Sequence, residues 1–219
     1  MKVRNLLIAS LALAALMAAF AFYTASRVPP GTELPTHWGL NGEPDRMRPA
    51  LQALMLPAGL LVLISGFFAI VPRLEPLQDR LQSSAPLLRA AWIGMIALMV
   101  LIQITAAGPV YGFDFGARPI VLAVGVLLLV IGNVLPKSRP GFFVGIRTPW
   151  TITDTDIWIA THRLGGKLMM LAGAAILVAT LLPIGDAARV MVMVTCAAGA
   201  GLVPAVYSWW LWHRNKVDA

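Results

Sequence analysis

The amino-acid sequence predicts an all-α protein, a polytopic membrane helix bundle with about six transmembrane helices and both termini in the cytoplasm. Three observations support this. The 219 residues are 58% hydrophobic and only 12% charged, about half the charged fraction of an average soluble domain. Six apolar stretches are each close to the ~20 residues needed to cross the hydrocarbon core. The Lys and Arg residues are shared unequally between alternate connecting segments.

The predicted spans are the six longest apolar runs. The fourth and fifth are short, so their polar flanks are expected to extend them, and strands are not expected because the runs do not alternate as barrel strands do. We divide the chain into residues 1–71, with two spans and the loop between them, and residues 72–219, with four spans. The runs are Leu6–Tyr23, Leu51–Val71, Ala90–Ala107, Pro119–Leu135, Leu168–Pro183 and Val190–Trp212.

A cleaved signal peptide is the alternative for the first run, since Lys2 and Arg4 precede it. Its 18 residues exceed the 7–15 typical of a signal-peptide core, so we expect an uncleaved span. The single cysteine, Cys196, lies within the last run, which excludes a disulfide within one chain. Tryptophans near the span ends, Trp92 and Trp158 among them, are interpreted mainly as an aromatic belt at the membrane interfaces.

Topology explains the net charge of +7 better than nucleic-acid binding does. The N-terminus, the second and fourth loops and the C-terminus together carry 12 of the 17 Lys and Arg residues, and the other three loops carry 5. Cytoplasmic segments are the ones enriched in Lys and Arg. We therefore expect the fourth loop to be cytoplasmic and the first loop to be extracytoplasmic, with no direct binding of nucleic acid.

The first loop contains the motif LPTHWGLNGEPDRM, from Leu34 to Met47. Asn41-Gly42 is a turn signal, and Glu43-Pro44-Asp45 breaks the chain again directly after it. One His with nearby carboxylates is a weak metal-ligand set, so neither a metal nor a cofactor is predicted. We expect mainly a structural cap with His37 bonded to backbone or carboxylate, and a ligand contact is the alternative. The candidate binding residues are His37, Trp38, Asn41, Gly42 and Asp45.

The second loop, RLEPLQDRLQSSAPLLR from Arg73 to Arg89, lacks aromatic residues and turn glycines. It is interpreted as a short interfacial helix or a linker.

The fourth loop is the other long connection, with GIRTPWT at its centre. Pro149 restricts Thr148 to extended geometry, so Arg147 and Trp150 are expected in a fixed kink. The following Thr and Asp residues are N-cap candidates for a helix on which Trp158 and His162 share a face. The candidate binding residues are Asn133, Arg147, Thr148, Pro149, Trp150, Trp158, Thr161 and His162.

Three roles stay open for this loop. Structural scaffolding and a binding surface for lipid, peptide or a partner protein are favoured. A catalytic or proton-handling set of Arg147, His162 and either Asp154 or Asp156 is the least favoured role.

The two loop motifs resemble those of the SdpI family. P-x-H-W-x-x-N-G-x-P-D is similar to an uncharacterised N-terminal domain of SdpI-type membrane proteins, and G-I-R-T-P-W-T followed by W-x-x-T-H resembles the family signature itself. Gly141 stands where the family often has a polar residue. The positions that carry over are Pro35, His37, Asn41, Gly42, Asn133, Pro136, Gly145, Arg147, Thr148, Pro149, Trp150, Trp158, Thr161, His162 and Gly166.

The resemblance implies a bacterial plasma-membrane protein that protects its producer from a secreted antimicrobial peptide toxin. It also implies signalling, with a small cytoplasmic repressor of the ArsR type as a partner. The rival hypotheses are a membrane enzyme or transporter acting on a lipid-linked or peptide substrate, and a structural subunit of a larger complex. Ionisable residues inside spans would favour the enzyme or transporter, and the spans contain almost none. We therefore favour binding without catalysis, and no oligomeric state is predicted.

Overall fold

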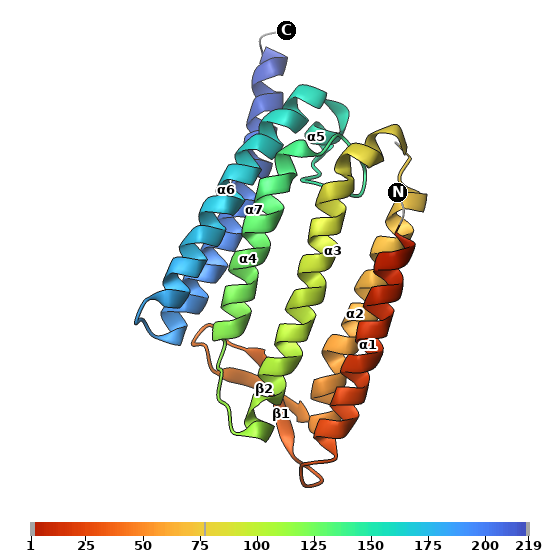
Figure 1. Cartoon of the computed structure of the whole chain (residues 1–219). Coiled ribbons are helices and arrows are strands. Elements are labelled where there is room, and N and C mark those ends of the chain that lie inside the picture. Colours follow the sequence, from red (N-terminus) through yellow and green to blue (C-terminus); the bar gives the residue numbers. More distant parts are fainter. Residues whose placement is uncertain (1–2, 77, 218–219) are drawn as a thin grey trace.

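A computed structural model describes residues 3–76 and 78–217, apart from the side chains of residues 78–82 and 217. Two of the cations counted above, Lys2 and the side chain of Arg80, lie outside the described part. Six long helices stand side by side, and the described chain begins and ends at the same end of the bundle (Figure 1). We call this the termini end, and the opposite end the hairpin end.

The predicted helix bundle is confirmed, because six helices of the described chain are long and apolar enough to cross a membrane. They are α1 (Arg4–Ala25), α2 (Ala50–Leu74), α3 (Gln78–Ala107), α4 (Arg118–Val134), α6 (Thr155–Leu181) and α7 (Asp186–Val217). The short elements are β1 (Glu33–Trp38), β2 (Pro44–Pro49), α5 (Pro149–Thr153) and the 3₁₀ turns η1 (Gly108–Tyr111) and η2 (Leu135–Lys137).

Two local predictions were wrong. Strands were not expected, but β1 and β2 pair as an antiparallel hairpin in the first loop, around a turn in which Gly42 has a φ of +80°. The absence of alternation in the apolar runs gave no information about this polar loop. The second loop was expected to be a short interfacial helix or a linker over Arg73–Arg89; it contains no separate helix, because α2 continues to Leu74 and α3 begins at Gln78, and a linker is confined to the short stretch between these two helices.

Polar side chains hold α1, α2 and α3 together. The indole N–H of Trp92 lies 3.1 Å from the hydroxyl oxygens of both Ser10 and Ser65. Trp92 is completely buried, so its predicted place in an aromatic belt was wrong. The side-chain amide of Gln103 donates to the carbonyl oxygens of Met17 and Leu54, at 2.9 and 2.8 Å. Such bonds between membrane helices contribute about 0.6–2 kcal/mol each.

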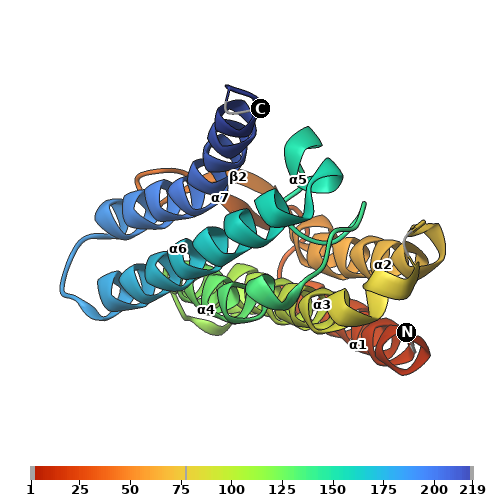
Figure 2. The same ribbon diagram turned by 90° about the horizontal axis from the view of Figure 1, so that it is seen from above.

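Glycines bring α4 and α6 into backbone contact. A Cβ on Gly132 would lie 2.8 Å from the carbonyl oxygen of Gly166, and a Cβ on Gly173 would lie 2.6 Å from that of Gly125. Small residues allow this close approach between membrane helices. Helix α4 lies between α3 and α6, and it thereby joins the first three long helices to α6 and α7 (Figure 2).

Candidate functional site

The residues singled out from the two loop motifs lie at opposite ends of the bundle. His37 and Trp38 lie on β1, Asp45 lies on β2, and Asn41 and Gly42 lie in the turn between the strands. The GIRTPWT residues, α5 and the first turns of α6 lie at the termini end (Figure 1). They therefore form two separate sites.

At the hairpin end, His37 is bonded to a carboxylate. Its Nδ1 lies 2.6 Å from Oδ1 of Asp45, and more than half of each side chain is exposed. Asn41 is bonded within the turn: its Nδ2 donates to Oε2 of Glu43 at 3.1 Å, and its Oδ1 accepts from the Glu43 N–H. These contacts fix the shape of the hairpin without covering His37.

The hairpin turn lies against the start of α7. A Cβ on Gly42 would come within 2.5 Å of the Asp186 Cβ. Asp186 in turn forms an ion pair with Arg189, with Nη1 and Oδ1 at 2.6 Å, and Arg189 also donates to the Leu182 carbonyl oxygen at 2.9 Å. The α6–α7 connection is therefore fixed beneath the hairpin turn.

Trp38 separates two cavities under the hairpin. The larger, of about 360 Å³, includes Phe113 and Phe115 in its wall, and the smaller, of about 230 Å³, includes His37 and Met193. Trp38 lines both of them. It packs against one cluster of buried residues from α1, α2 and α3 and against another from α4, α6 and α7. Pockets of this kind, apolar with a few polar groups at the rim, are typical binding sites.

At the termini end, His162 is completely buried and stacks on Trp158 with ring centroids 3.9 Å apart. Its Nδ1 lies 2.8 Å from the Trp158 carbonyl oxygen, and its Nε2 accepts the Ile146 N–H at 2.9 Å. The ring is therefore a neutral Nδ1–H tautomer. Gly145 has a φ of +119°, and a Cβ there would lie 2.5 Å from Nε2 of His162. Trp158 is likewise buried, so it too is no belt residue.

At the expected kink, Thr148 is extended and forms the N-cap of α5 in a capping box. Thr148 and Thr151 cap each other at the start of α5, with the Thr148 N–H donating to Oγ1 of Thr151 at 2.9 Å. The Thr148 hydroxyl also lies 3.0 Å from that of Ser208 on α7. Pro149 opens the helix, and Trp150 packs on Trp212 with ring centroids 5.9 Å apart. Helix α5 is therefore packed against the C-terminal part of α7.

The remaining candidates of this end are not brought into one cluster. Arg147 donates from Nη1 to the Phe142 carbonyl oxygen at 3.1 Å, and its side chain is exposed. Asn133 is exposed on α4. Thr161 is buried, and its hydroxyl has no hydrogen-bond partner among the described residues. Asp154 caps α6 by accepting two backbone N–H groups.

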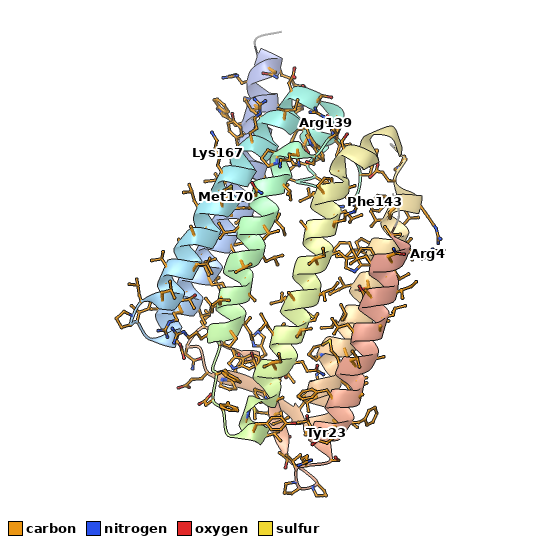
Figure 3. All side chains as sticks on the ribbon, viewed as in Figure 1. Arg4, Tyr23, Arg139, Phe143, Lys167 and Met170 are labelled. Atoms are coloured by element: carbon orange, nitrogen blue, oxygen red, sulfur yellow. The ribbon has the colours of Figure 1, made fainter. Side chains whose placement is uncertain are left out.

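Glu75, at the end of α2, is a site residue that the sequence reasoning missed. It is buried, with 3% of its surface exposed. Its carboxylate accepts the N–H groups of Phe142 and Phe143 at 3.0–3.2 Å, which holds in place the loop that precedes GIRTPWT; Phe143 is labelled in Figure 3. A Cβ on Gly141 would lie 3.2 Å from Oε2 of Glu75. The available signal was a lone acidic residue at the end of a long apolar run.

This geometry does not favour acid–base chemistry at His162. Both ring nitrogens are bonded to the main chain, and the Asp154 carboxylate is committed to the helix cap. A general base needs a free nitrogen within reach of a substrate proton. Within the described residues, no group of three or more His, Cys, Asp or Glu side chains is arranged to hold a metal ion.

Comparison with known proteins gives matches to both parts of the chain. The SdpI/YfhL protein family matches residues 137–208, and a domain of unknown function, DUF1648, matches residues 11–61. The chain is 24% identical over 147 residues to the immunity protein SdpI of Bacillus subtilis (strain 168), which covers 67% of this chain and 68% of that protein. No solved structure matches this chain.

The two matches include both sites. DUF1648 runs from α1 through the hairpin into α2, and the SdpI/YfhL region runs from η2 through α5 and α6 into α7. Asn133 and Glu75 lie outside them. The resemblance inferred from the two motifs is therefore confirmed: this is a multi-pass protein of the bacterial cell membrane that carries an SdpI/YfhL family region behind a DUF1648 region.

Proposed function

We propose that this protein is an immunity protein that binds a secreted antimicrobial peptide toxin at the hairpin end. The observation that carries the proposal is the position of Trp38 between two cavities beneath the hairpin. Trp38 is half-buried, and tryptophans are frequent anchors of binding energy in protein interfaces. A peptide with apolar side chains would fill the cavities and meet the exposed His37–Asp45 pair at their rim.

The charge distribution supports the sidedness that this function requires. The segments richest in Lys and Arg belong to the termini end, which the positive-inside rule assigns to the cytoplasm. The hairpin then faces outward, where a secreted peptide arrives.

We further propose that the termini end docks a cytoplasmic repressor. Arg147 and Pro149 are exposed there, and Lys216 lies 4.2 Å above the ring of Trp212. Helix α7 contacts the hairpin turn through Asp186 and α5 through Ser208. A peptide that shifts the hairpin would thereby bias the position of α5, as coupling between two sites requires.

A protection assay tests the binding function. A sensitive bacterium expressing the chain is challenged with a panel of secreted antimicrobial peptides, and survival is compared at equal membrane levels of protein. Trp38→Ala should abolish protection, because it removes the wall shared by both cavities. Leu40→Ala is the matched control, since Leu40 is 58% exposed at the hairpin tip and lines neither cavity. Full protection by Trp38→Ala, or turnover of the peptide by the purified protein, would refute the proposal.

A further inference from the structure

An apolar groove runs between α3 and α4 on the outside of the bundle. It has a volume of about 370 Å³, and every residue that lines it is apolar. It extends along α3 from Ala90 to Leu101, about 17 Å at 1.5 Å per residue. This is close to half of the ~30 Å hydrocarbon core, so the groove has the length of one leaflet.

Exposed residues follow both margins of the groove. On α3, the exposed residues Ile93 and Ala97 line it, and on α4 the exposed residues Leu122, Val126 and Val130 do so. The three- and four-residue spacing of each row keeps it on one helix face. Both rows are therefore open to the lipid.

Each row continues into a polar residue at the termini end. Arg89 lies four residues before Ile93 on α3, and Asn133 lies three residues after Val130 on α4. Lys137 follows in the 3₁₀ turn η2, directly after α4, and all three residues are exposed. Within the described part of the chain, no hydrogen bond or ion pair engages these three side chains.

The helix register brings these polar residues to one level. Gly94 is in contact with Leu127 across the interface. Because α3 and α4 are antiparallel, a step of five residues back along α3 and of six residues forward along α4 brings Arg89 and Asn133 to a similar level of the bundle. Lys137 lies about one turn further towards the termini end.

The two ends of the groove differ in charge. At the hairpin end, Arg118 donates from Nη2 to the Thr180 carbonyl oxygen at 2.9 Å. At the termini end, two cations and an amide remain available beside an apolar channel of one leaflet's length. Charge and shape therefore both match an anionic phospholipid, with its acyl chain in the groove and its phosphate at the cations.

We propose that the α3–α4 groove is a binding site for an anionic phospholipid of the leaflet at the termini end. Arg89 and Lys137 contact the phosphate, and Asn133 hydrogen-bonds the headgroup or the glycerol ester. This gives Asn133, which lies apart from the two loop sites, a role of its own. The site is independent of peptide binding at the hairpin.

Native mass spectrometry of the detergent-solubilised full chain tests this proposal. The protein is titrated with phosphatidylglycerol and with phosphatidylcholine of the same acyl chains. We expect phosphatidylglycerol to bind more tightly, and the Arg89→Gln, Lys137→Gln double variant to weaken its binding by about thirtyfold, as the loss of two cations near a membrane surface predicts. Soluble glycerol phosphate should not compete, since it has no chain for the groove.

The matched control removes the same charge elsewhere at the same end. Arg163 and Lys167 are exposed on α6, where Figure 3 labels Lys167, and their double change to Gln should leave lipid binding unchanged. An equal loss in both double variants would overturn the proposal, because it would show general surface attraction.

A photo-crosslinker at Ala97 gives a second readout in the bilayer. Lipid adducts are expected, whereas capture of a peptide or of a second copy of this chain instead of lipid would overturn the assignment.

Discussion

Gly42 in the hairpin turn and Asp186 at the start of α7 touch so closely that no side chain fits between them. A Cβ on Gly42 would lie 2.5 Å from the Asp186 Cβ and 3.0 Å from its carbonyl carbon. Residues 144 positions apart in the chain therefore join the DUF1648 region to the SdpI/YfhL region. The contact provides a direct structural link between the two parts.

Gly42→Ala should detach the hairpin from α7. The substitution combines a φ of +80° with the clash at Asp186, and the φ alone costs about 1–2 kcal/mol. Gly31→Ala is the matched control, since Gly31 has a φ of +88° with no atom within 4 Å of its Cβ position. Thermal unfolding of the purified protein should show a larger loss for Gly42→Ala, and equal losses would show that the contact contributes nothing.

Gly145→Ala should disrupt the site around His162. A methyl group there would meet Nε2 of His162 at 2.5 Å and the Trp158 ring at 2.8 Å, which displaces the Ile146 N–H from its acceptor. A buried donor left without a partner costs about 1–3 kcal/mol. Hydrogen exchange at Ile146 should accelerate. Gly112→Ala, at a φ of +79° with open space around it, should leave that amide protected.

Glu75→Leu should release the loop that precedes GIRTPWT. The change removes both acceptor oxygens from the Phe142 and Phe143 N–H groups, so both amides should exchange faster. Glu75→Gln keeps one carbonyl oxygen and should give an intermediate rate. If exchange at Phe142 and Phe143 were the same in all three proteins, the carboxylate would not be what holds the loop.

Gln103→Leu should loosen the packing of α1 and α2 on α3. It removes the donor that bridges the Met17 and Leu54 carbonyl oxygens, and we expect a loss of about 1–2 kcal/mol in the free energy of unfolding. Chemical unfolding in mixed micelles measures it. Thr195→Val is the control, because the Thr195 hydroxyl bonds only within its own helix; a comparable loss there would contradict the bridging role.

Cysteine labelling should place the hairpin outside the cell. In a Cys196→Ala background, Leu40→Cys at the hairpin tip should react with a membrane-impermeant maleimide in intact cells. Arg139→Cys at the termini end should react only after the cells are opened. Both positions are exposed, whereas the neighbouring Ser138 is buried and would not report sidedness. Reversed labelling would contradict the topology inferred from the charges.

The sequence was informative where a local rule applies. Run length predicted the spans, and the single extended position before Pro149 predicted the kink that became the capping box of Thr148 and Thr151. The Asn41-Gly42 turn signal lies where the hairpin turns, although the paired strands around it were not anticipated.

Long-range contacts could not be predicted in the same way. Nothing local indicates that Glu75 meets residues 142 and 143, or that Trp92 lies between Ser10 and Ser65. Tryptophan near a span end suits both a membrane interface and a buried hydrogen bond, and only the packing of the helices decides between them.

The glycine contacts between α4 and α6 have a mechanical consequence. Gly132 meets Gly166, and Gly125 and Gly173 meet seven residues further along each helix. Backbones that touch at two points a full two turns apart cannot slide or rotate past each other without a clash. We expect α4 and α6 to move together as one rigid body. Any motion of α1, α2 and α3 relative to α4, α6 and α7 would then take place at the interface between α3 and α4.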